Sequence, residues 1–385
     1  MPQKSHFGNT FAFYTFLNSQ FCRYFLNFDA ENKKNDKIIM RKLLALVAVA
    51  VVVFAATGND KRYQVFGVAF YNLENFFDTI NNNGKYDYEY TENGSKKWDG
   101  EKYRNKVHNM AYAISQMTTQ STPMGPAIIG VSEIENITPL QDLVKDPALK
   151  DKRLQIVHHD SPDLRGIDVA LLYNPRFFRV LNVVNSRVVV DGYPEFKTRD
   201  QMCVTGLLAG EKVSVIVNHW PSRSGGQERS NYLREAAAKR VRLTVDSLLR
   251  DDPNQGIIIM GDLNDDPFDP SVAEVLGAKK DMDDVEEPGD LYNPWWETLD
   301  KGIGSLAYRG QWNLFDQIIV SQYFLGDRSR LTFFKNEVLN FDFLKTSEGD
   351  RKGYPLRTHA SGVYLNGYSD HFPTEIFLVK EVKNN

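Results

Sequence analysis

The chain has 385 residues, of which 42% are hydrophobic and 25% are charged, and its formal net charge is −4. This composition is typical of a globular protein and excludes a disordered or fibrous chain. It also excludes a strongly basic protein that binds nucleic acid by neutralising phosphates with its own side chains. Mild acidity is compatible with a phosphate-processing enzyme, because bound metal ions add positive charge that residue counts omit.

The N-terminal part of the chain is typical of an exported protein. From Met40, two basic residues precede an unbroken apolar run at 43–56. This run is short for a membrane-spanning helix, and it matches the apolar region of a secretory signal peptide. Residues 40–56 are therefore predicted to be a signal peptide that directs export to the periplasm or the medium. Residues 1–39 are unlike a leader, so Met40 is expected to be the true start and 1–39 a non-native upstream extension.

Short apolar runs recur through the rest of the chain, at 65–73, 127–134, 168–173, 213–220, 256–263, 315–321 and 374–379. Each is of strand length, and most are apolar at successive positions, as expected for strands buried on both faces. The segment 227–250 instead has an apolar stripe at helical spacing. No linker or repeat interrupts this pattern. Residues 60–385 are therefore predicted to form a single α/β domain in which helices cover the sheets.

Cysteine usage limits the chemistry further. The chain contains Cys22 and Cys203, and only Cys203 lies beyond the predicted leader. The predicted mature chain therefore has no internal disulfide and no cysteine metal cluster. Cys203 lies in an apolar stretch and is expected to be a small buried side chain rather than a nucleophile.

Polar side chains suited to metal and phosphate chemistry stand at the ends of six of these runs: Asn72 and Glu74, Glu133, Asn218 and His219, Asp262 and Asn264, Asp316, and Asp370 and His371. Ligand sites gather at the strand ends of open α/β sheets. If these groups converge, several buried carboxylates require a cation to offset their repulsion. Oxygen ligands without cysteine suit Mg²⁺, with Mn²⁺ or Ca²⁺ as alternatives.

The same residues form a series of motifs in a fixed order: NLE at 72–74, SEIEN at 132–136, NHWPS at 218–222, GDLN at 261–264, FDQ at 315–317 and SDH at 369–371. This series resembles the endonuclease/exonuclease/phosphatase superfamily, the group of deoxyribonuclease I, apurinic endonucleases, sphingomyelinases and inositol-polyphosphate phosphatases. The resemblance extends from about Phe66 to Val379. It implies an α/β fold, a four-layer sandwich of two packed mixed β-sheets flanked by helices.

The resemblance implies a metal-binding role for four of these residues. Glu133 is the expected main metal ligand, with Asn72 and Glu74 beside it. Asp370 is expected near a second ion, if the site holds two.

The resemblance also implies catalytic roles. His371, oriented by Asp316, is the expected general base for in-line attack of water on phosphorus. Asp262 is expected to position that water, and Asn264 to donate a hydrogen bond to the phosphate. His219 is expected to bind a phosphoryl oxygen or to assist the leaving group.

Three further residues are predicted to support substrate binding. Asn218 is expected to support His219, its neighbour in the chain. Arg165, in the sequence RGID, and Arg223, in the sequence WPSRSGGQER, lie in predicted loops. Arginines in such loops can clamp a phosphate, although both are equally compatible with exposed loop residues.

These features together predict an exported, divalent-metal-dependent phosphodiesterase, with an endonuclease acting on nucleic acid as the favoured activity. A phosphatase, or a lipid or inositol-phosphate phosphodiesterase of the same superfamily, is the alternative, because substrate choice depends on loops. A binding protein on a dead enzyme scaffold is disfavoured, since no key position is missing. The expected partner is nucleic acid or another phosphate-ester substrate, and the chain is expected to be a monomer without a stable protein partner.

Overall fold

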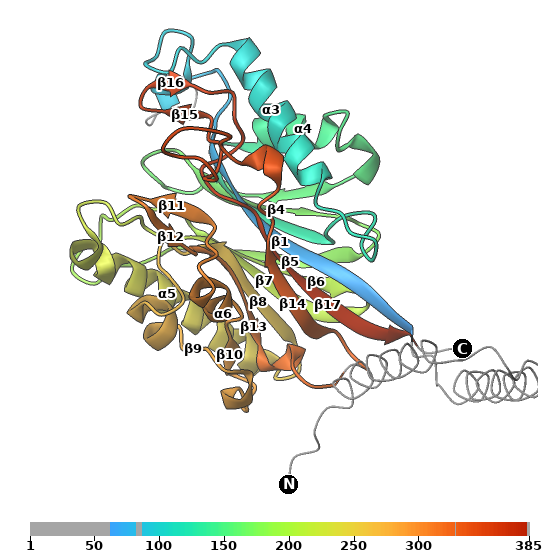
Figure 1. Cartoon of the computed structure of the whole chain (residues 1–385). Helices are drawn as coiled ribbons and strands as arrows, with labels where there is room; N and C mark the ends of the chain where they lie inside the picture. Colours follow the sequence, from blue (N-terminus) through green and yellow to red (C-terminus); the bar gives the residue numbers. More distant parts are fainter. Residues whose placement is uncertain (1–61, 82–86, 328, 383–385) are drawn as a thin grey trace, which may run out of the picture. The chain divides into compact units, whose positions relative to one another are not determined.

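Two β-sheets lie at the centre of the structure, a computed structural model that describes residues 62–81, 87–327 and 329–382 (Figure 1). The predicted leader segments 1–39 and 40–56 lie outside the described residues. The first sheet has the strand order β14-β17-β1-β2-β4-β3. Its strands are β1 (Arg62–Phe76), β2 (Ile128–Ile134), β3 (Gln155–His158), β4 (Asp168–Tyr173), β14 (Thr332–Val338) and β17 (Thr374–Val382).

The second sheet has the strand order β5-β6-β7-β8-β13-β10-β9. Its strands are β5 (Phe178–Ser186), β6 (Gln201–Leu208), β7 (Glu211–His219), β8 (Gly256–Asp262), β9 (Ala278–Lys279), β10 (Leu291–Tyr292) and β13 (Asp316–Ser321). Both sheets are mixed: β1 pairs with β2, and β7 with β8, in parallel, whereas β17 and β13 run antiparallel to their neighbours. Two small hairpins complete the strands: β11 (Leu306–Tyr308) with β12 (Gln311–Asn313), and β15 (His359–Ala360) with β16 (Val363–Tyr364).

Alternating side chains of the seven-stranded sheet point to its two faces, as strand geometry requires. Along β8, Ile258 and Met260 face the core between the two sheets, where residues of β1 and β2 also pack. Ile257 and Ile259, on the opposite face, join a second apolar cluster. Because both faces of this strand are apolar, the sheet is buried on each side, which explains the continuous apolar runs of the sequence.

Helices cover the outer faces of the two sheets: α3 (Gly100–Ser115), α4 (Ile137–Lys145) and α5 (Gln227–Asp251). The short helix α6 (Trp295–Asp300) instead packs Trp295 into the main core beside Ile318. In Figure 1, α3 and α4 lie against the six-stranded sheet, and α5 lies on the other side of the molecule. Ala237, Val241 and Val245 of α5, four residues apart, are fully buried against Ile257 and Ile259 of β8. None of the described helices is both long enough and apolar enough to span a membrane.

The structure confirms the predicted α/β sandwich of two mixed sheets flanked by helices. Each predicted apolar run is a strand, and the predicted helix at 227–250 is α5. The edge strands β5 and β14 were not predicted, because their exposed faces break the apolar pattern: Leu181 and Val184 of β5 and Phe334 of β14 are all about half exposed. Cys203, on β6, is a buried free thiol, as predicted.

Candidate active site

The predicted site residues meet at one edge of the two sheets because of the strand directions. The parallel pairs β1–β2 and β7–β8 end at this edge, and the antiparallel strands β13 and β17 begin there. Asp262 is the last residue of β8, and in the register of the sheet it stands between His219 of β7 and Asp316 of β13. Gly261 allows this close approach, since a Cβ atom there would lie 2.3 Å from the carbonyl oxygen of Asn218.

His371 and Asp316 form a buried hydrogen-bonded pair that joins the two sheets. His371 Nδ1 lies 2.6 Å from Asp316 Oδ2, and that same oxygen accepts a hydrogen bond of 2.5 Å from Ser305 Oγ. Asp316 belongs to the seven-stranded sheet, whereas His371 precedes the first residues of β17 in the six-stranded sheet. Burial lowers the pKa of His371, but the carboxylates of Asp316 and Asp262 outweigh burial and raise this pKa well above its ordinary value.

Asp262 lies between two histidines at the centre of the site. Its Oδ2 is 3.6 Å from His219 Nε2 and 3.9 Å from His371 Nε2, and it accepts a hydrogen bond of 3.0 Å from Asn72 Nδ2. Burial raises the pKa of Asp262 to about 7, against the opposing charge of His371. Burial also lowers the pKa of His219 well below its ordinary value, and the nearby Arg199 adds to this effect. His219 is therefore held neutral, and its ring can accept or donate a hydrogen bond.

Glu133 presents an open carboxylate oxygen to the site. Its Oε2 accepts a hydrogen bond of 2.8 Å from the backbone nitrogen of Asn75 and lies 3.4 Å from Arg165 Nη2. Its Oε1 faces His219 Nε2 at 4.0 Å, and within the described ranges no hydrogen bond reaches it. Asn72 Nδ2 donates a hydrogen bond to Asp262, which orients the amide. Asn72 Oδ1 then accepts a hydrogen bond from the backbone nitrogen of Glu74.

Arg357, which the sequence motifs did not indicate, connects two of the predicted metal ligands. Its Nε donates to Glu74 Oε1 at 3.1 Å, and its Nη2 donates to Asp370 Oδ2. The other oxygen of Glu74 accepts a hydrogen bond of 2.6 Å from the backbone nitrogen of Thr358. Burial and the charge of Asp370 raise the pKa of Glu74 to about 7, while Lys106 and Arg357 oppose the shift.

Several site residues lie in left-handed backbone conformations. Glu74, Asn75, Glu133 and Asn264 have φ angles of 48°, 50°, 61° and 51°. Such conformations are uncommon for residues other than glycine and cost free energy, so they persist only where the surrounding structure holds them. Here the holding contacts are visible: the backbone nitrogen of Asn264 donates to Asp262 Oδ1 at 3.0 Å, and Arg223 Nε donates to the carbonyl oxygen of Asn264 at 2.9 Å.

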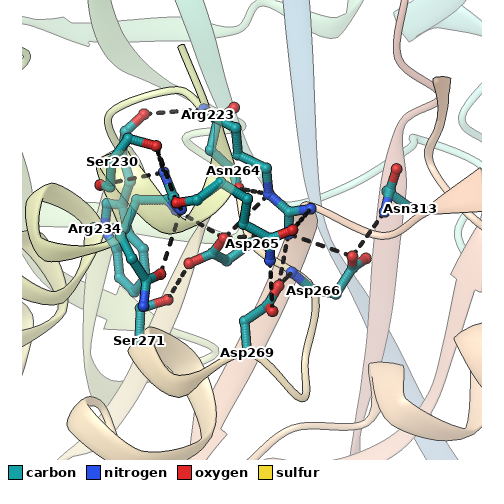
Figure 2. Close-up of polar contacts among 12 residues, drawn as sticks. Arg223, Ser230, Arg234, Asn264, Asp265, Asp266, Asp269, Ser271 and Asn313 are labelled. Carbon is teal, nitrogen blue, oxygen red and sulfur yellow. Dashed lines mark hydrogen bonds and ion pairs between the residues drawn. The ribbon is translucent and has the colours of Figure 1, made fainter. Parts of the chain in front are cut away.

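Arg223 is part of a separate cluster beside the site rather than an open phosphate clamp. Its guanidinium pairs with Asp265, Asp266 and Asp269, and Arg234 also pairs with Asp265, at 2.7 Å (Figure 2). We call these five residues the acid–arginine cluster. Its bonds to Arg223 indicate a supporting role for this residue, which holds the turn that carries Asn264.

Two other predicted substrate-binding residues also have clear positions. Asn218 is fully buried, and its amide donates to the carbonyl oxygens of Ile216 and Met260 while accepting from Trp220 Nε1. It therefore supports the end of β7 and does not face the substrate side. Arg165 is 45% exposed at the rim of the site. There its guanidinium also contacts the side chain of Asn75 at 2.5 Å.

Sequence patterns also gave no sign of three buried residues that hold the site together. Ser305 donates to Asp316, and Lys106 Nζ donates to Thr358 Oγ1 at 2.7 Å and to the carbonyl oxygen of Tyr368. Arg199 donates to the carbonyl oxygen of His219 at 3.0 Å. Each acts through a partner distant in the chain, so no local motif contains the signal.

The donors at this edge fit a hard divalent cation. The acidic and amide oxygens of Glu133, Asn72, Glu74 and Asp370 are the ligand type that Mg²⁺ and Mn²⁺ prefer. The Oε1 of Glu133 accepts no hydrogen bond from the described residues, so this ligand oxygen is available to a cation. In the described part of the chain, Asp262, Asp316 and His371 also place one ligand atom each within 4.8 Å of one another.

Comparisons with known proteins agree with this geometry. A profile of the Endonuclease/Exonuclease/phosphatase family matches residues 67–380. Among solved structures, a humanized TDP2 of D. rerio is similar with a TM-score of 0.50 and 13% sequence identity, covering 82% of this chain and 99% of that one. A mannosyl-6-phosphatase of Bacteroides thetaiotaomicron is similar with a TM-score of 0.50 and 17% identity, covering 81% and 99%. No curated protein matches the chain.

The chain therefore belongs to the Endonuclease/Exonuclease/phosphatase family. It is a hydrolase of phosphate esters, the reaction class that the sequence motifs predicted. Enzymes of this family use divalent metal ions, and the oxygen donors described above are of the kind such an ion needs.

Proposed function

We propose that the protein is a phosphodiesterase that cleaves nucleic acid with the help of Mg²⁺, and that it acts as a monomer. The observation that supports this most directly is the His371–Asp316 pair, held at 2.6 Å beside Asp262. Asp262 also lies 3.6 Å from His219, whose Nε2 is 4.0 Å from Glu133 Oε1. A base held by an acid, next to a metal-binding carboxylate, is the arrangement that in-line hydrolysis of a phosphate ester requires.

His371 is the proposed base for the attacking water. Asp316 holds the ring through Nδ1, so Nε2 is the nitrogen that faces Asp262 and the substrate side. Asp262, fixed by hydrogen bonds from Asn72 and from the backbone of Asn264, orients the water. A bound Mg²⁺ would neutralise the phosphoryl oxygens from the side of Glu133.

His219 and Asn264 are the proposed contacts to the phosphate. His219 is neutral and lies 4.0 Å from Glu133 Oε1, so its ring can donate to a phosphoryl oxygen or to the leaving group. The side-chain nitrogen of Asn264 donates to the carbonyl oxygen of Trp220 at 3.0 Å, which fixes the amide while one hydrogen remains for the phosphate.

The test is hydrolysis by the full chain of plasmid DNA and of bis-p-nitrophenyl phosphate, with Mg²⁺, Mn²⁺, Ca²⁺ or EDTA. Metal-dependent cleavage of both substrates is expected. His371→Ala should lose roughly 10²–10⁴-fold in rate, the usual contribution of a general base, with an unchanged thermal unfolding curve. Near-wild-type activity in that variant would remove His371 as the base.

A phosphatase is the second candidate, because the fold likeness to the mannosyl-6-phosphatase equals that to TDP2. Arg165, partly exposed beside Glu133, offers an additional cation for the second negative charge of a phosphomonoester. Mannose 6-phosphate therefore belongs in the same assay. Release of phosphate from it, without cleavage of either diester, would favour this candidate over the nuclease.

We further propose that the protein is exported, on the sequence of residues 40–56. Mass spectrometry of the N-terminus of the natively expressed protein, taken from outside the cytoplasm, tests this. A mature chain that begins after residue 56 is expected. Recovery of an intact segment 43–56 in the cytoplasmic fraction would contradict export.

A further inference from the structure

The contacts of Arg357 bear on how many metal ions the site holds. Glu74 and Asp370 belong to the predicted ligand set, yet both are bound to this one guanidinium: Arg357 Nε lies 3.1 Å from Glu74 Oε1, and Nη2 donates to Asp370 Oδ2. A guanidinium remains charged at every pH a protein experiences, and its planar group suits carboxylates. Arg357 thus supplies, between these two acids, the positive charge that an ion would supply elsewhere.

Both oxygens of Glu74 are engaged. Oε1 accepts from Arg357, and Oε2 accepts from the backbone nitrogen of Thr358 at 2.6 Å. Glu74 is also only 5% exposed, so a metal ion that bound it would have to share its oxygens with Arg357 and Thr358. Glu133 differs, because its Oε1 has no such donor among the described residues.

A buried lysine holds the residue next to Arg357, so the arginine is not on a free surface loop. The neighbouring Thr358 binds the ammonium of Lys106 through Oγ1 at 2.7 Å, and that ammonium also binds the carbonyl oxygen of Tyr368. Lys106 is buried within α3, with 1% of its surface exposed. Tyr368 stands two residues before Asp370. The ammonium of Lys106 therefore binds the chain next to both Arg357 and Asp370.

We infer that Arg357 is a built-in counter-ion that occupies the position of a second metal ion, so that the site binds a single divalent ion, at Glu133. This inference rests on the proposed metal-dependent function. It assigns Glu74 and Asp370 a positioning role, as the partners of Arg357, instead of the direct metal contact that the sequence motifs implied.

The experiment counts bound Mn²⁺ on the full chain, by isothermal titration calorimetry and by the electron paramagnetic resonance signal of free Mn²⁺. One ion per chain is expected for the wild type. Arg357→Ala frees two carboxylates and is expected to bind a second ion, with spin coupling between the two. Arg357→Ala combined with Asp370→Asn should return to one ion, and Arg357→Lys, which keeps the positive charge, should also bind one.

Two controls separate this effect from general damage. Arg242→Ala removes an arginine that pairs with Asp246 at 2.7 Å on α5, away from the site, and should leave one ion bound. In the otherwise wild-type chain, Asp370→Asn should also keep one ion, because Asp370 is not expected to be a ligand. If Arg357→Ala fails to fold, two ions in the wild type or loss of the ion in Asp370→Asn would still overturn the inference.

The outcomes are distinct. Two ions in the wild type, one ion at unchanged affinity in Arg357→Ala, or loss of the ion in Asp370→Asn would each overturn the inference. If the wild type binds one ion and hydrolyses a diester while Arg357→Ala gains nothing, only this inference fails. If the wild type binds no divalent ion, the proposed function fails with it.

Discussion

Two groups of acidic side chains lie close together around the end of β8, and they differ in how their oxygens are used. In the acid–arginine cluster, every carboxylate oxygen of Asp265, Asp266 and Asp269 accepts a hydrogen bond or an ion pair. The two arginines and the surrounding amides leave no oxygen for another ligand (Figure 2). At the active site, by contrast, Glu133 Oε1 and Asp316 Oδ1 have no hydrogen-bond partner among the described residues.

The number of acidic residues therefore does not by itself identify a metal site. In the acid–arginine cluster two arginines offset most of the charge of three aspartates, and every carboxylate oxygen has a partner. Buried polar groups with complete networks stabilise one structure, whereas an open oxygen beside other ligand groups is available to a cation. At the active site, Glu133 and Asp316 are the carboxylates with an open oxygen.

Asp265→Ala should act on stability and not on metal binding. It leaves Arg234, which is fully buried, without its ion-pair partner, and breaking a buried pair costs about 3–5 kcal/mol. Urea unfolding followed by circular dichroism measures the change, while Mn²⁺ stoichiometry in the folded variant stays the same. As the control, Asp246→Ala breaks a more exposed pair with Arg242 and should cost about 0–1 kcal/mol. Equal losses in both variants would contradict the contrast.

Glu133→Gln should weaken metal binding and leave stability unchanged. The substitution removes the charge of the carboxylate that has an open oxygen, so the affinity for Mn²⁺ should fall by at least about 100-fold. This is the upper end of the loss seen when an outer-shell partner of a metal ligand is removed. The thermal unfolding temperature of the metal-free variant should stay near that of the wild type. Unchanged Mn²⁺ affinity in calorimetry would exclude Glu133 as the main ligand.

Ser305→Ala should produce a smaller loss of activity. Ser305 Oγ donates to Asp316 Oδ2 at 2.5 Å, and its removal leaves this oxygen with His371 alone. A lost buried hydrogen bond costs about 1–3 kcal/mol, so kcat should fall by about tenfold, with little change in KM. Ser115→Ala, at a partly exposed serine of α3, is the matched control. A change in KM alone would mean that Ser305 does not act through the base.

Glu375→Gln tests whether an open oxygen is enough to make a site. Glu375 is buried opposite Glu337 in the sheet, and its Oε1 has no partner among the described residues, yet no histidine or second ligand converges on it. Burial, with the charge of Glu337, raises its pKa to about 8. Mn²⁺ binding should therefore be unaffected.

The stability of this variant should depend on pH instead. In the unfolded chain the carboxyl ionises near 4.5, whereas in the fold it stays protonated to about 8. The native state therefore loses stability as the pH rises through this window. Glutamine does not ionise, so the melting temperature of the variant relative to wild type should increase from pH about 5 to about 8, by an amount equivalent to about 3–4 kcal/mol. A difference that is constant with pH would contradict the assignment.

Much of this site could be predicted because its residues end apolar strands. Asn72, Glu133, Asp262 and His371 each adjoin a buried strand, and a parallel strand arrangement brings such ends to one edge. The core of the fold was predictable for the same reason, since buried strands leave continuous apolar runs. Edge strands such as β5 were not, because their exposed faces remove that pattern.

The remaining site residues depend on contacts that no local pattern contains. Lys106 occupies a helix, where a lysine is ordinarily solvent-exposed, and its partner Thr358 lies near the other end of the chain. Arg357 lies in an irregular loop, and only the fold brings it to Glu74. For Arg223 the local sequence was misleading. A loop arginine near a catalytic motif suggested phosphate binding, but the aspartates of the acid–arginine cluster bind its guanidinium.

Because the His371–Asp316 hydrogen bond joins the two sheets, the catalytic rate should depend on how the sheets are positioned relative to each other. Each sheet keeps its own backbone hydrogen bonds, whereas the proposed base, His371, and the acid that holds it, Asp316, come from different sheets. A slip of about 1 Å between the sheets would leave both sets of backbone hydrogen bonds intact yet misplace the base, which can cost about 100-fold in rate. Turnover should consequently decline at denaturant concentrations where far-ultraviolet circular dichroism still reports native secondary structure.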